Sequence, residues 1–317
     1  MKKVLAIILA IVMTLSLSTV SFAAESKEAQ DALEAIDTGT LFIQKVYETI
    51  HLIVHGFSRV FESNCPMCNV VDATPEDFAE VLANAAKGEV VSLDAGDYGV
   101  LTLGTIDGIG ITAKEGANVD KIDIPAEADL KDVTISGFDL VIVENKDYGI
   151  SIDTEAKIEN LVIENVTFTG PSTVKGCYGI KGHNNAATMT VRNCTFNGTG
   201  YAMYTTGKFG YADLTVEECT FTNIYSWVIH LQYGFNGNMT ITGCTFAECD
   251  DGIAKHGSFA ADKTFTFTNN IVGADCAGHD GKDSKWFELK TANAVIEGNT
   301  FAGAEWIPGD AQGIKAL

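Results

Sequence analysis

The sequence predicts an all-β fold, a right-handed parallel β-helix with an N-terminal α-helical cap. Two observations predict this fold. A short segment of alternating apolar and polar residues recurs about every 25 to 29 residues, and no ten-residue helical pattern interrupts the repeats. Coils of a parallel β-helix stack about 4.8 Å apart, so equivalent residues of successive repeats should lie directly above one another.

Residues 1–23 have the layout of a secretory signal peptide. Lys2 and Lys3 precede an apolar run from Val4 to Leu17, and small residues precede a cleavage site at Ala24. The apolar run is short for a membrane span. We therefore expect a secreted or cell-surface protein that contacts the membrane only through its signal peptide, before cleavage.

Residues 24–72 are predicted to form an amphipathic helical segment that also holds a CxxC pair, Cys65 and Cys68. Apolar residues recur at helical spacing between Ile43 and Val60. Packing on the β-helix or on a second copy is favoured over attachment to a membrane surface, because the polar face lacks dense lysine and arginine. A structural disulfide or a free thiol pair is favoured over a redox site.

The β-helix is predicted to span 73–317 and to begin with a capping helix at 75–87. Thr74 is placed to cap that helix, Pro75 fits its first turn, and Gly88 fits its end. A β-helix has open ends, and an amphipathic helix at this place would cover one of them.

The repeats themselves predict two or three short strands in each coil. Their third and eighth positions are apolar, and asparagine or glycine predominates at the fifth, which indicates a bend. A second strand follows each repeat, as at 178–180 and 201–203. Six segments align without gaps: Leu161–Phe168, Met189–Phe196, Leu214–Phe221, Met239–Phe246, Phe265–Val272 and Ala294–Phe301.

The cysteines are predicted to be structural. Cys194, Cys219 and Cys244 occupy one column of the repeat, together with Val166, so they should form an inward ladder of small buried side chains. Cys249 and Cys276 follow equivalent strand ends in neighbouring coils. We expect these two to lie close enough to pair.

The charge of the chain restricts its partners. A formal charge of −21 argues against nucleic acid, because binding to phosphates requires a basic face. It also repels acidic polysaccharides unless a cation such as Ca²⁺ intervenes. Calcium is therefore a possible cofactor, and no other cofactor is indicated.

The outward positions of the second strands form the candidate functional face. Three of the six histidines fall there, beside an aromatic residue and carboxylates, a combination that could hold a sugar. With the alternation counted along each strand, the face comprises Ser151, Asp153, Lys181, His183, Tyr204, Thr206, His230, Gln232, Ala254, His256, Glu288 and Lys290. The substrate-binding candidates are Lys181, His183, Tyr204, His230, Gln232 and Glu288.

From about Thr74 to the C-terminus, the repeats resemble the pectate-lyase-like superfamily of right-handed parallel β-helix proteins. Within them, Asp250-Asp251-Gly252, Gly278-His279-Asp280 and Glu288-Leu289-Lys290 resemble three segments of polygalacturonases. Glu288 stands where that family has arginine, and the third segment follows the second too closely to lie one coil further on. No counterpart of the family's earlier aspartate occurs near Trp227.

The resemblance implies two kinds of catalysis. Two carboxylates could act as general acid and base in an inverting hydrolase. A polysaccharide lyase of this fold would instead use a lysine base, such as Lys181, Lys255 or Lys290, together with a cation. The catalytic candidates are Asp250, Asp251, His256 and Lys290.

Two functions are therefore expected. In the first, the protein binds or cleaves a complex extracellular polysaccharide, or a cell-surface glycan, on the second-strand face. In the alternative, it is a non-enzymatic cell-surface or adhesive scaffold. The mostly short turns favour the scaffold, and the longer excursions at 169–177, 197–212 and 273–284 favour the glycan-binding protein.

Overall fold

A computed structural model describes most of the chain from Asn69 onward. The unit Met1–Cys68 lies outside the described residues, and with it the predicted signal peptide, the Ile43–Val60 helix and the CxxC pair. The described residues are 69–182, 188–205, 213–231, 237–256, 259–273, 275–276, 286–291, 293–302 and 314–315.

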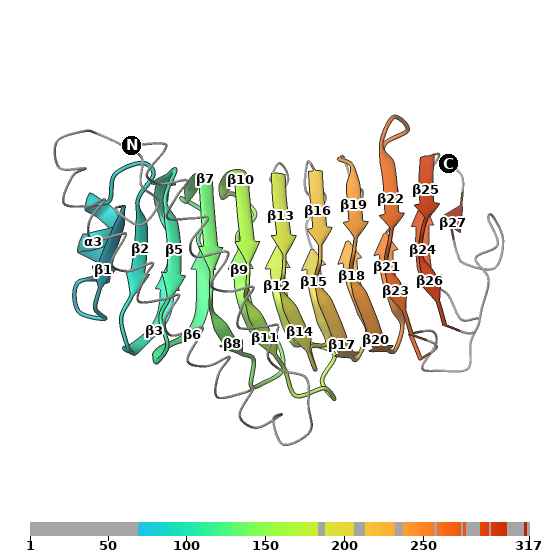
Figure 1. Ribbon diagram of the computed structural model, residues 1–317, viewed down its shortest axis with the longest axis horizontal. Coiled ribbons are helices and arrows are strands. Elements are labelled where there is room, and N and C mark those ends of the chain that lie inside the picture. Colours follow the sequence, from blue (N-terminus) through green and yellow to red (C-terminus); the bar gives the residue numbers. More distant parts are fainter. Residues whose placement is uncertain are drawn as a thin grey trace, which may run out of the picture. The chain divides into compact units, whose positions relative to one another are not determined.

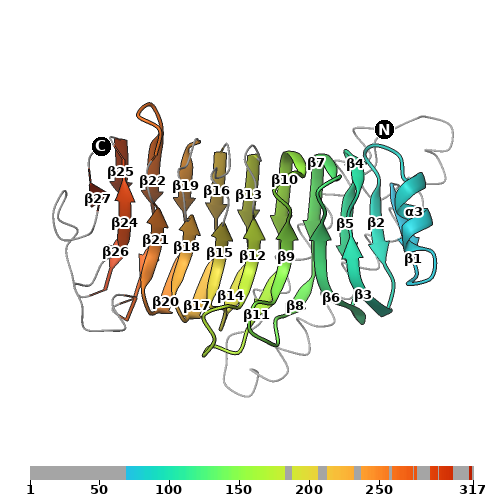
Figure 2. The same ribbon diagram turned by 180° about the vertical axis from the view of Figure 1, so that it is seen from behind.

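The strands of Asn69–Leu317 form three sheets in which every pairing among the described residues is parallel (Figures 1 and 2). The first sheet contains β1 (Val70–Ala73), β2 (Val90–Leu93), β4 (Thr105–Asp107), β5 (Gly110–Ala113), β7 (Asp129–Ser136), β10 (Lys157–Glu164), β13 (Thr188–Arg192), β16 (Asp213–Glu217), β19 (Met239–Thr242), β22 (Thr264–Thr268) and β25 (Asn293–Glu297). The second contains β3 (Gly96–Thr102), β6 (Ala117–Ile124), β9 (Tyr148–Ile152), β12 (Tyr178–Gly182), β15 (Tyr201–Thr205), β18 (Trp227–Leu231), β21 (Gly252–His256), β24 (Phe287–Lys290) and β27 (Ile314–Lys315). The third contains β8 (Asp139–Val141), β11 (Thr167–Thr169), β14 (Thr195–Asn197), β17 (Thr220–Ile224), β20 (Thr245–Cys249), β23 (Ile271–Val272) and β26 (Thr300–Phe301).

The start of the coil differs from the prediction in two ways. β1 begins at Val70, so the β-helix starts three residues before the predicted boundary. The helix α3 spans Phe78–Asn84 and is shorter at both ends than expected. Thr74 does not cap it, because the helix begins at Phe78 with Asp77 at the N-cap position, so Thr74 and Pro75 lie in the turn before the helix.

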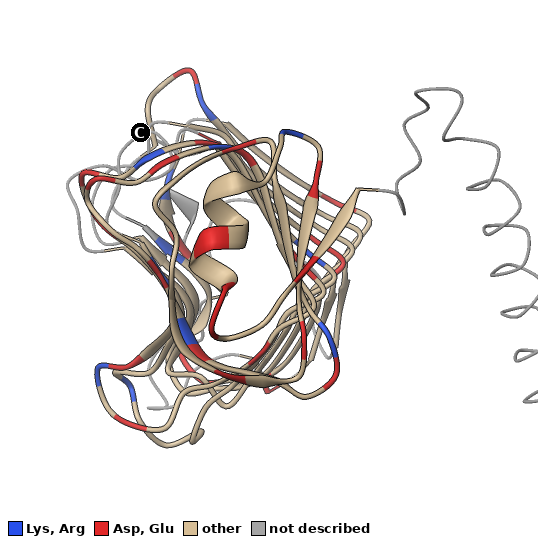
Figure 3. Ribbon diagram, turned by 90° about the vertical axis from the view of Figure 1, so that its left-hand side faces the viewer, with Lys and Arg blue, Asp and Glu red and all other residues tan. Residues whose placement is uncertain are grey.

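The helix α3 packs on the first coil. Phe78 is buried, and its ring meets the ring of Tyr98 edge-on with the centroids 6.1 Å apart. In the view along the coil, α3 lies within the outline of the stacked strands (Figure 3). A role for α3 in protecting the end of the β-helix stays a prediction.

The repeat register is confirmed. Leu161 pairs with Met189, which pairs with Leu214, and the column continues along the first sheet. The predicted bends have left-handed backbone, with φ of 53° at Asn165 and 65° at Gly243. Glu218 takes the same conformation, φ 54°, although it is neither asparagine nor glycine. The stacked coils therefore impose the bend even where the side chain does not favour it.

The core is built from columns of identical side chains. In the third sheet the rings of Phe168, Phe196, Phe221 and Phe246 stack with successive centroid distances of 4.5, 5.1 and 5.0 Å. All four rings are buried. Parallel pairing at one spacing keeps each ring directly above the previous one, so every ring both fills the core and contacts two neighbours.

The cysteine ladder is also confirmed. Cys194, Cys219 and Cys244 are free thiols with 1% exposure each. Hydrogen bonds that Cys219 donates to the neighbouring Cys194 and Cys244 thiols, followed by burial, raise the pKa of Cys219, so this thiol is unreactive. Cys249 and Cys276 are also buried and free, and their thiols contact each other as expected.

Candidate functional site

The second sheet aligns one outward row of polar and aromatic side chains. Each member is half-buried, and each belongs to the next strand of the sheet. The register gives the order Ser151, Lys181, Tyr204, His230, Lys255 and Glu288. The predicted row therefore exists for Lys181, Tyr204, His230 and Glu288.

The prediction of Ala254 and His256 in this row was wrong by one residue. Trp227 pairs with Gly252, so Lys255 lies beside His230, and Ala254 is fully buried. The backbone of His256 pairs with that of Leu231, an inward position. Counting the alternation from Asp251 gives the wrong face, because Asp251 belongs to the turn before β21.

Three predicted members of the face cannot be placed. His183, Thr206 and Gln232 follow the ends of their strands and lie outside the described residues, as does the side chain of His256.

A second row, at the first residue of each strand, was missed by the sequence reasoning. Tyr148, Tyr178 and Tyr201 are adjacent in the register. The Tyr178 and Tyr201 rings stack with centroids 5.7 Å apart and an interplanar angle of 10°. The signal was a tyrosine at the start of three successive second strands.

The two rows meet in one cluster of rings. The Tyr204 ring lies 4.9 Å from both Tyr178 and Tyr201. The His230 imidazole lies 5.4 Å from Tyr201 and 5.3 Å from Tyr204. Burial raises the pKa of Tyr148 to about 12, with help from a hydrogen bond to Asp123, so its phenol stays neutral at physiological pH.

Lysines lie over these rings at cation–π distance. Lys181 Nζ is 5.7 Å from the centroids of both Tyr148 and Tyr178. Another lysine, Lys121, lies 4.9 Å from Tyr148. Similar contacts join Lys175 to Tyr201 at 6.0 Å and Lys255 to Trp227 at 5.4 Å. We name this cluster the ring face; two of its rings, Tyr201 and Trp227, are buried. It comprises Tyr148, Tyr178, Tyr201, Tyr204, Trp227, His230, Lys121, Lys175, Lys181 and Lys255.

Three of these lysines also pair with carboxylates. Lys121 contacts Asp147 (3.1 Å), Lys175 contacts Asp251 (3.7 Å) and Lys255 contacts Glu288 (3.0 Å). Within the described residues, Lys181 has no carboxylate partner at ion-pair distance, and its cationic contacts are the two tyrosine rings. Lys181 is therefore the ring-face cation whose charge is most available to a ligand.

His230 is held as a neutral imidazole. Burial, followed by the charges of Lys255 and Lys175, lowers its pKa from 6.5 to about 4. Its Nδ1 is buried and has no hydrogen-bond partner among the described residues. A buried polar atom without a partner is costly to the folded state.

We expect the depressed pKa of His230 to make stability depend on pH. Between pH 6.5 and about 4 the unfolded chain binds a proton at this position and the folded chain does not, so the free energy of unfolding falls as the pH drops. The loss should reach about 2 kcal/mol after allowance for partial exposure. Denaturant unfolding from pH 7 to pH 4 measures it. The variant His230→Gln should remove this part of the slope, and an unchanged slope would contradict the assignment.

The predicted acids lie at the edge of the ring face. Asp251 accepts a hydrogen bond from Ser226 Oγ (2.5 Å) and pairs with Lys175, the lysine that lies over the Tyr201 ring. Asp250 occupies the same turn, where its N–H donates to the Ile224 carbonyl. Lys290 is exposed two residues beyond Glu288. The structure thus brings the predicted acid Asp251, together with Glu288, to the ring face, and each of them is paired with a lysine.

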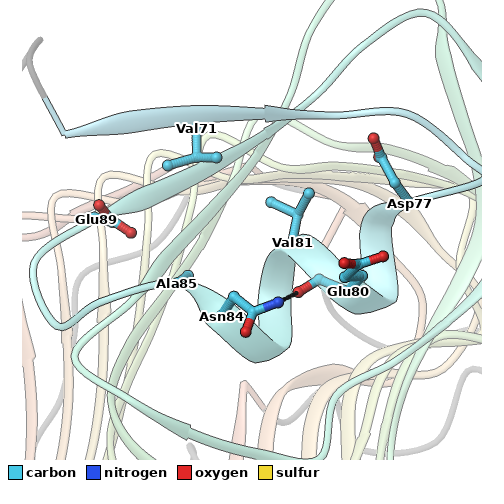
Figure 4. A pocket seen from close by; sticks show the side chains of 7 residues that line it. All are labelled: Val71, Asp77, Glu80, Val81, Asn84, Ala85 and Glu89. Atoms are coloured by element: carbon cyan, nitrogen blue, oxygen red, sulfur yellow. Dashed lines mark hydrogen bonds between the residues drawn. The ribbon is translucent and has the colours of Figure 1, made fainter.

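A separate hollow of about 390 Å³ lies between α3 and β1 (Figure 4). Two of its carboxylates are used locally: Asp77 Oδ1 accepts the Thr74 N–H (2.6 Å), and Glu89 Oε2 accepts the Ala86 N–H (2.7 Å). Asn84 Nδ2 donates to the Glu80 carbonyl (2.8 Å). These polar groups therefore serve the local fold around α3.

Within the part of the chain that the structure describes, no three His, Cys, Asp or Glu side chains come together as a metal site would require. The expected role of calcium stays a prediction. No helix in that same part is long and apolar enough to span a membrane.

Comparison with known families agrees with this architecture. Residues 110–301 match a family described as "Right handed beta helix region". The chain belongs to this right-handed β-helix family. A search of curated proteins finds no match. The β-helix fold supports many chemistries, so family membership establishes the coil and its handedness but not the ligand. The finer resemblance to pectate lyases and polygalacturonases stays a prediction.

Proposed function

We propose that this right-handed β-helix protein is exported and binds a complex polysaccharide across its ring face. The observation that carries the proposal is the continuous cluster of Tyr178, Tyr201, Tyr204 and His230 rings on successive strands. Sugars offer apolar C–H faces that pack on aromatic rings and hydroxyls that need hydrogen-bond partners. The ring face supplies both kinds of contact.

The extent of the ring face supports a polymer over a single sugar. Its members come from β9, β12, β15 and β18, and neighbouring strands lie about 4.8 Å apart. The face therefore extends roughly 15 Å along the axis of the coil, farther than one sugar ring. An extended glycan running along the axis would meet a new ring at every coil.

Binding is favoured over cleavage. Three carboxylates at the ring face are held by lysines: Asp147 by Lys121, Asp251 by Lys175 and Glu288 by Lys255. A general acid requires a raised pKa and a general base requires access to a water molecule. We therefore propose a binding role, and assays for reducing sugars and unsaturated products on any bound glycan test the hydrolase and lyase alternatives.

A glycan-array screen of the full chain, with and without Ca²⁺, tests the proposal. We expect binding to at least one polysaccharide class, weakened several-fold by Lys181→Ala because the most available cation is removed. Lys157→Ala is the matched control, since Lys157 is an exposed lysine of the first sheet. Binding of no glycan in either condition would contradict the proposal and leave the adhesive scaffold as the better account.

A further inference from the structure

The third sheet has a free edge at β8. The first sheet begins at β1 and the second at β3, whereas the third begins at β8, which among the described strands pairs with β11 alone (Figures 1 and 2). A strand edge without a neighbour presents a row of backbone N–H and C=O groups to another chain.

The orientation of the β8 backbone follows from its bonds to β11. The Phe138 carbonyl accepts the Thr167 N–H, and the Ile142 N–H donates to the Thr169 carbonyl, each at 2.8 Å. Alternate residues of a parallel strand bond to opposite sides. The N–H and C=O groups of Asp139 and Val141 therefore point away from β11, and within the described residues none of these four groups has a hydrogen-bond partner.

A groove lies along this free edge. It has a volume of about 580 Å³, and its walls are the segment 113–120 and the residues Asp139, Val141 and Val143. Val141 is 57% exposed and Val143 is 71% exposed, more than any other large hydrophobic side chain of the described residues. Unpaired backbone and exposed valines thus occupy the same surface.

The charge of the groove selects its partner. Glu115, Asp120 and Asp139 are exposed carboxylates on its walls. Its lysine, Lys114, is already bound to Asp72 (2.6 Å) and Asp94 (2.7 Å). A partner that binds this acidic groove must therefore carry positive charge. A second copy of this chain is disfavoured, because its formal charge is −21.

We infer that the β8 edge is a strand-addition site for an extended peptide with alternating basic and apolar side chains. The peptide main chain would pair with Asp139 and Val141. Its apolar side chains would cover Val141 and Val143, and its basic side chains would meet Glu115 and Asp120. Strand addition obtains affinity from main-chain bonds and specificity from alternate side chains. This site is separate from the ring face and does not depend on glycan binding.

The test uses the full chain and a fluorescent, acetylated hexapeptide of alternating lysine and valine, followed by anisotropy. Val141→Pro removes one edge N–H, a change that an edge strand tolerates because this group bonds to nothing within the protein. We expect Val141→Pro to weaken binding at least tenfold with unchanged thermal unfolding. Hydrogen exchange should slow at the amides of Asp139 and Val141 on binding, and not at Val100, an exposed valine of β3.

Two altered peptides separate backbone pairing from charge. Methylation of alternate peptide nitrogens on the pairing edge should abolish binding, because it removes main-chain donors while keeping every side chain. Replacement of lysine by glutamate should also abolish it. Absence of binding by the original peptide, equal binding by the methylated or acidic peptide, or full binding by a folded Val141→Pro variant would each overturn the inference.

Discussion

Replacing Phe221 by alanine is expected to lower the free energy of unfolding by about 4 kcal/mol. The Phe221 ring is fully buried in β17, between the rings of Phe196 at 5.1 Å and Phe246 at 5.0 Å. The substitution removes two stacking contacts and leaves a cavity between coils that the sheet hydrogen bonds prevent from closing. Denaturant unfolding of the full chain measures the loss.

Two variants of β17 serve as controls for the Phe221 substitution. Phe221→Leu keeps most of the volume and should cost less than half as much. Thr222→Ala changes the half-exposed neighbour and should stay within about 0.5 kcal/mol. A loss below about 1 kcal/mol for Phe221→Ala would show that the phenylalanine stack does not carry the core. Unfolding of a coil of stacked repeats need not be two-state. The denaturant concentration at the unfolding midpoint and the dependence of the unfolding free energy on denaturant are therefore compared together.

The paired substitution Tyr178→Ala and Tyr204→Ala is expected to weaken glycan binding about 30-fold or more. Each ring that packs on a sugar face should contribute about 1 to 1.5 kcal/mol, and 1.4 kcal/mol corresponds to a factor of ten. Titration calorimetry with a glycan found by the array measures the change. Circular dichroism and thermal unfolding must accompany it, because the Tyr178 and Tyr204 rings also pack on each other.

The matching pair Tyr178→Phe and Tyr204→Phe separates stacking from hydrogen bonding. Phenylalanine keeps the ring and loses the hydroxyl, so affinity should fall only a few-fold if stacking dominates. An equal loss in the phenylalanine and alanine pairs would assign the contribution to the hydroxyls instead.

Most of the coil could be predicted from the sequence because a solenoid repeats its environment. The columns that hold Phe196, Cys219 and Val216 face the core in every coil, and the same residue types recur there. Asn270 shows the limit of this argument. It occupies the cysteine column and is 1% exposed, because its amide donates to the Ile241 carbonyl and accepts the Cys244 N–H. Burial of a polar residue depends on bonds between coils that the sequence does not display.

The candidate site was predicted less completely. The row through Lys181 and His230 follows from strand alternation. The position of Lys255 depends on the residue at which β21 begins. An error of one residue in that start assigns every side chain of the strand to the wrong face. The tyrosine row was not predicted, because the sequence argument counted only later residues of each second strand as outward, whereas Tyr148, Tyr178 and Tyr201 stand at the first position. The free edge of β8 could not be predicted, since it depends on which coil first forms a third strand.

The most direct test of glycan binding at the ring face is the calorimetric titration of one array-selected polysaccharide into three proteins: the unaltered chain, the Tyr178/Tyr204 alanine pair and the phenylalanine pair. The account predicts tight binding by the unaltered chain, a loss of about 30-fold or more in the alanine pair, and near-retention in the phenylalanine pair. Equal affinity in all three folded proteins would contradict it and place the glycan elsewhere on the coil.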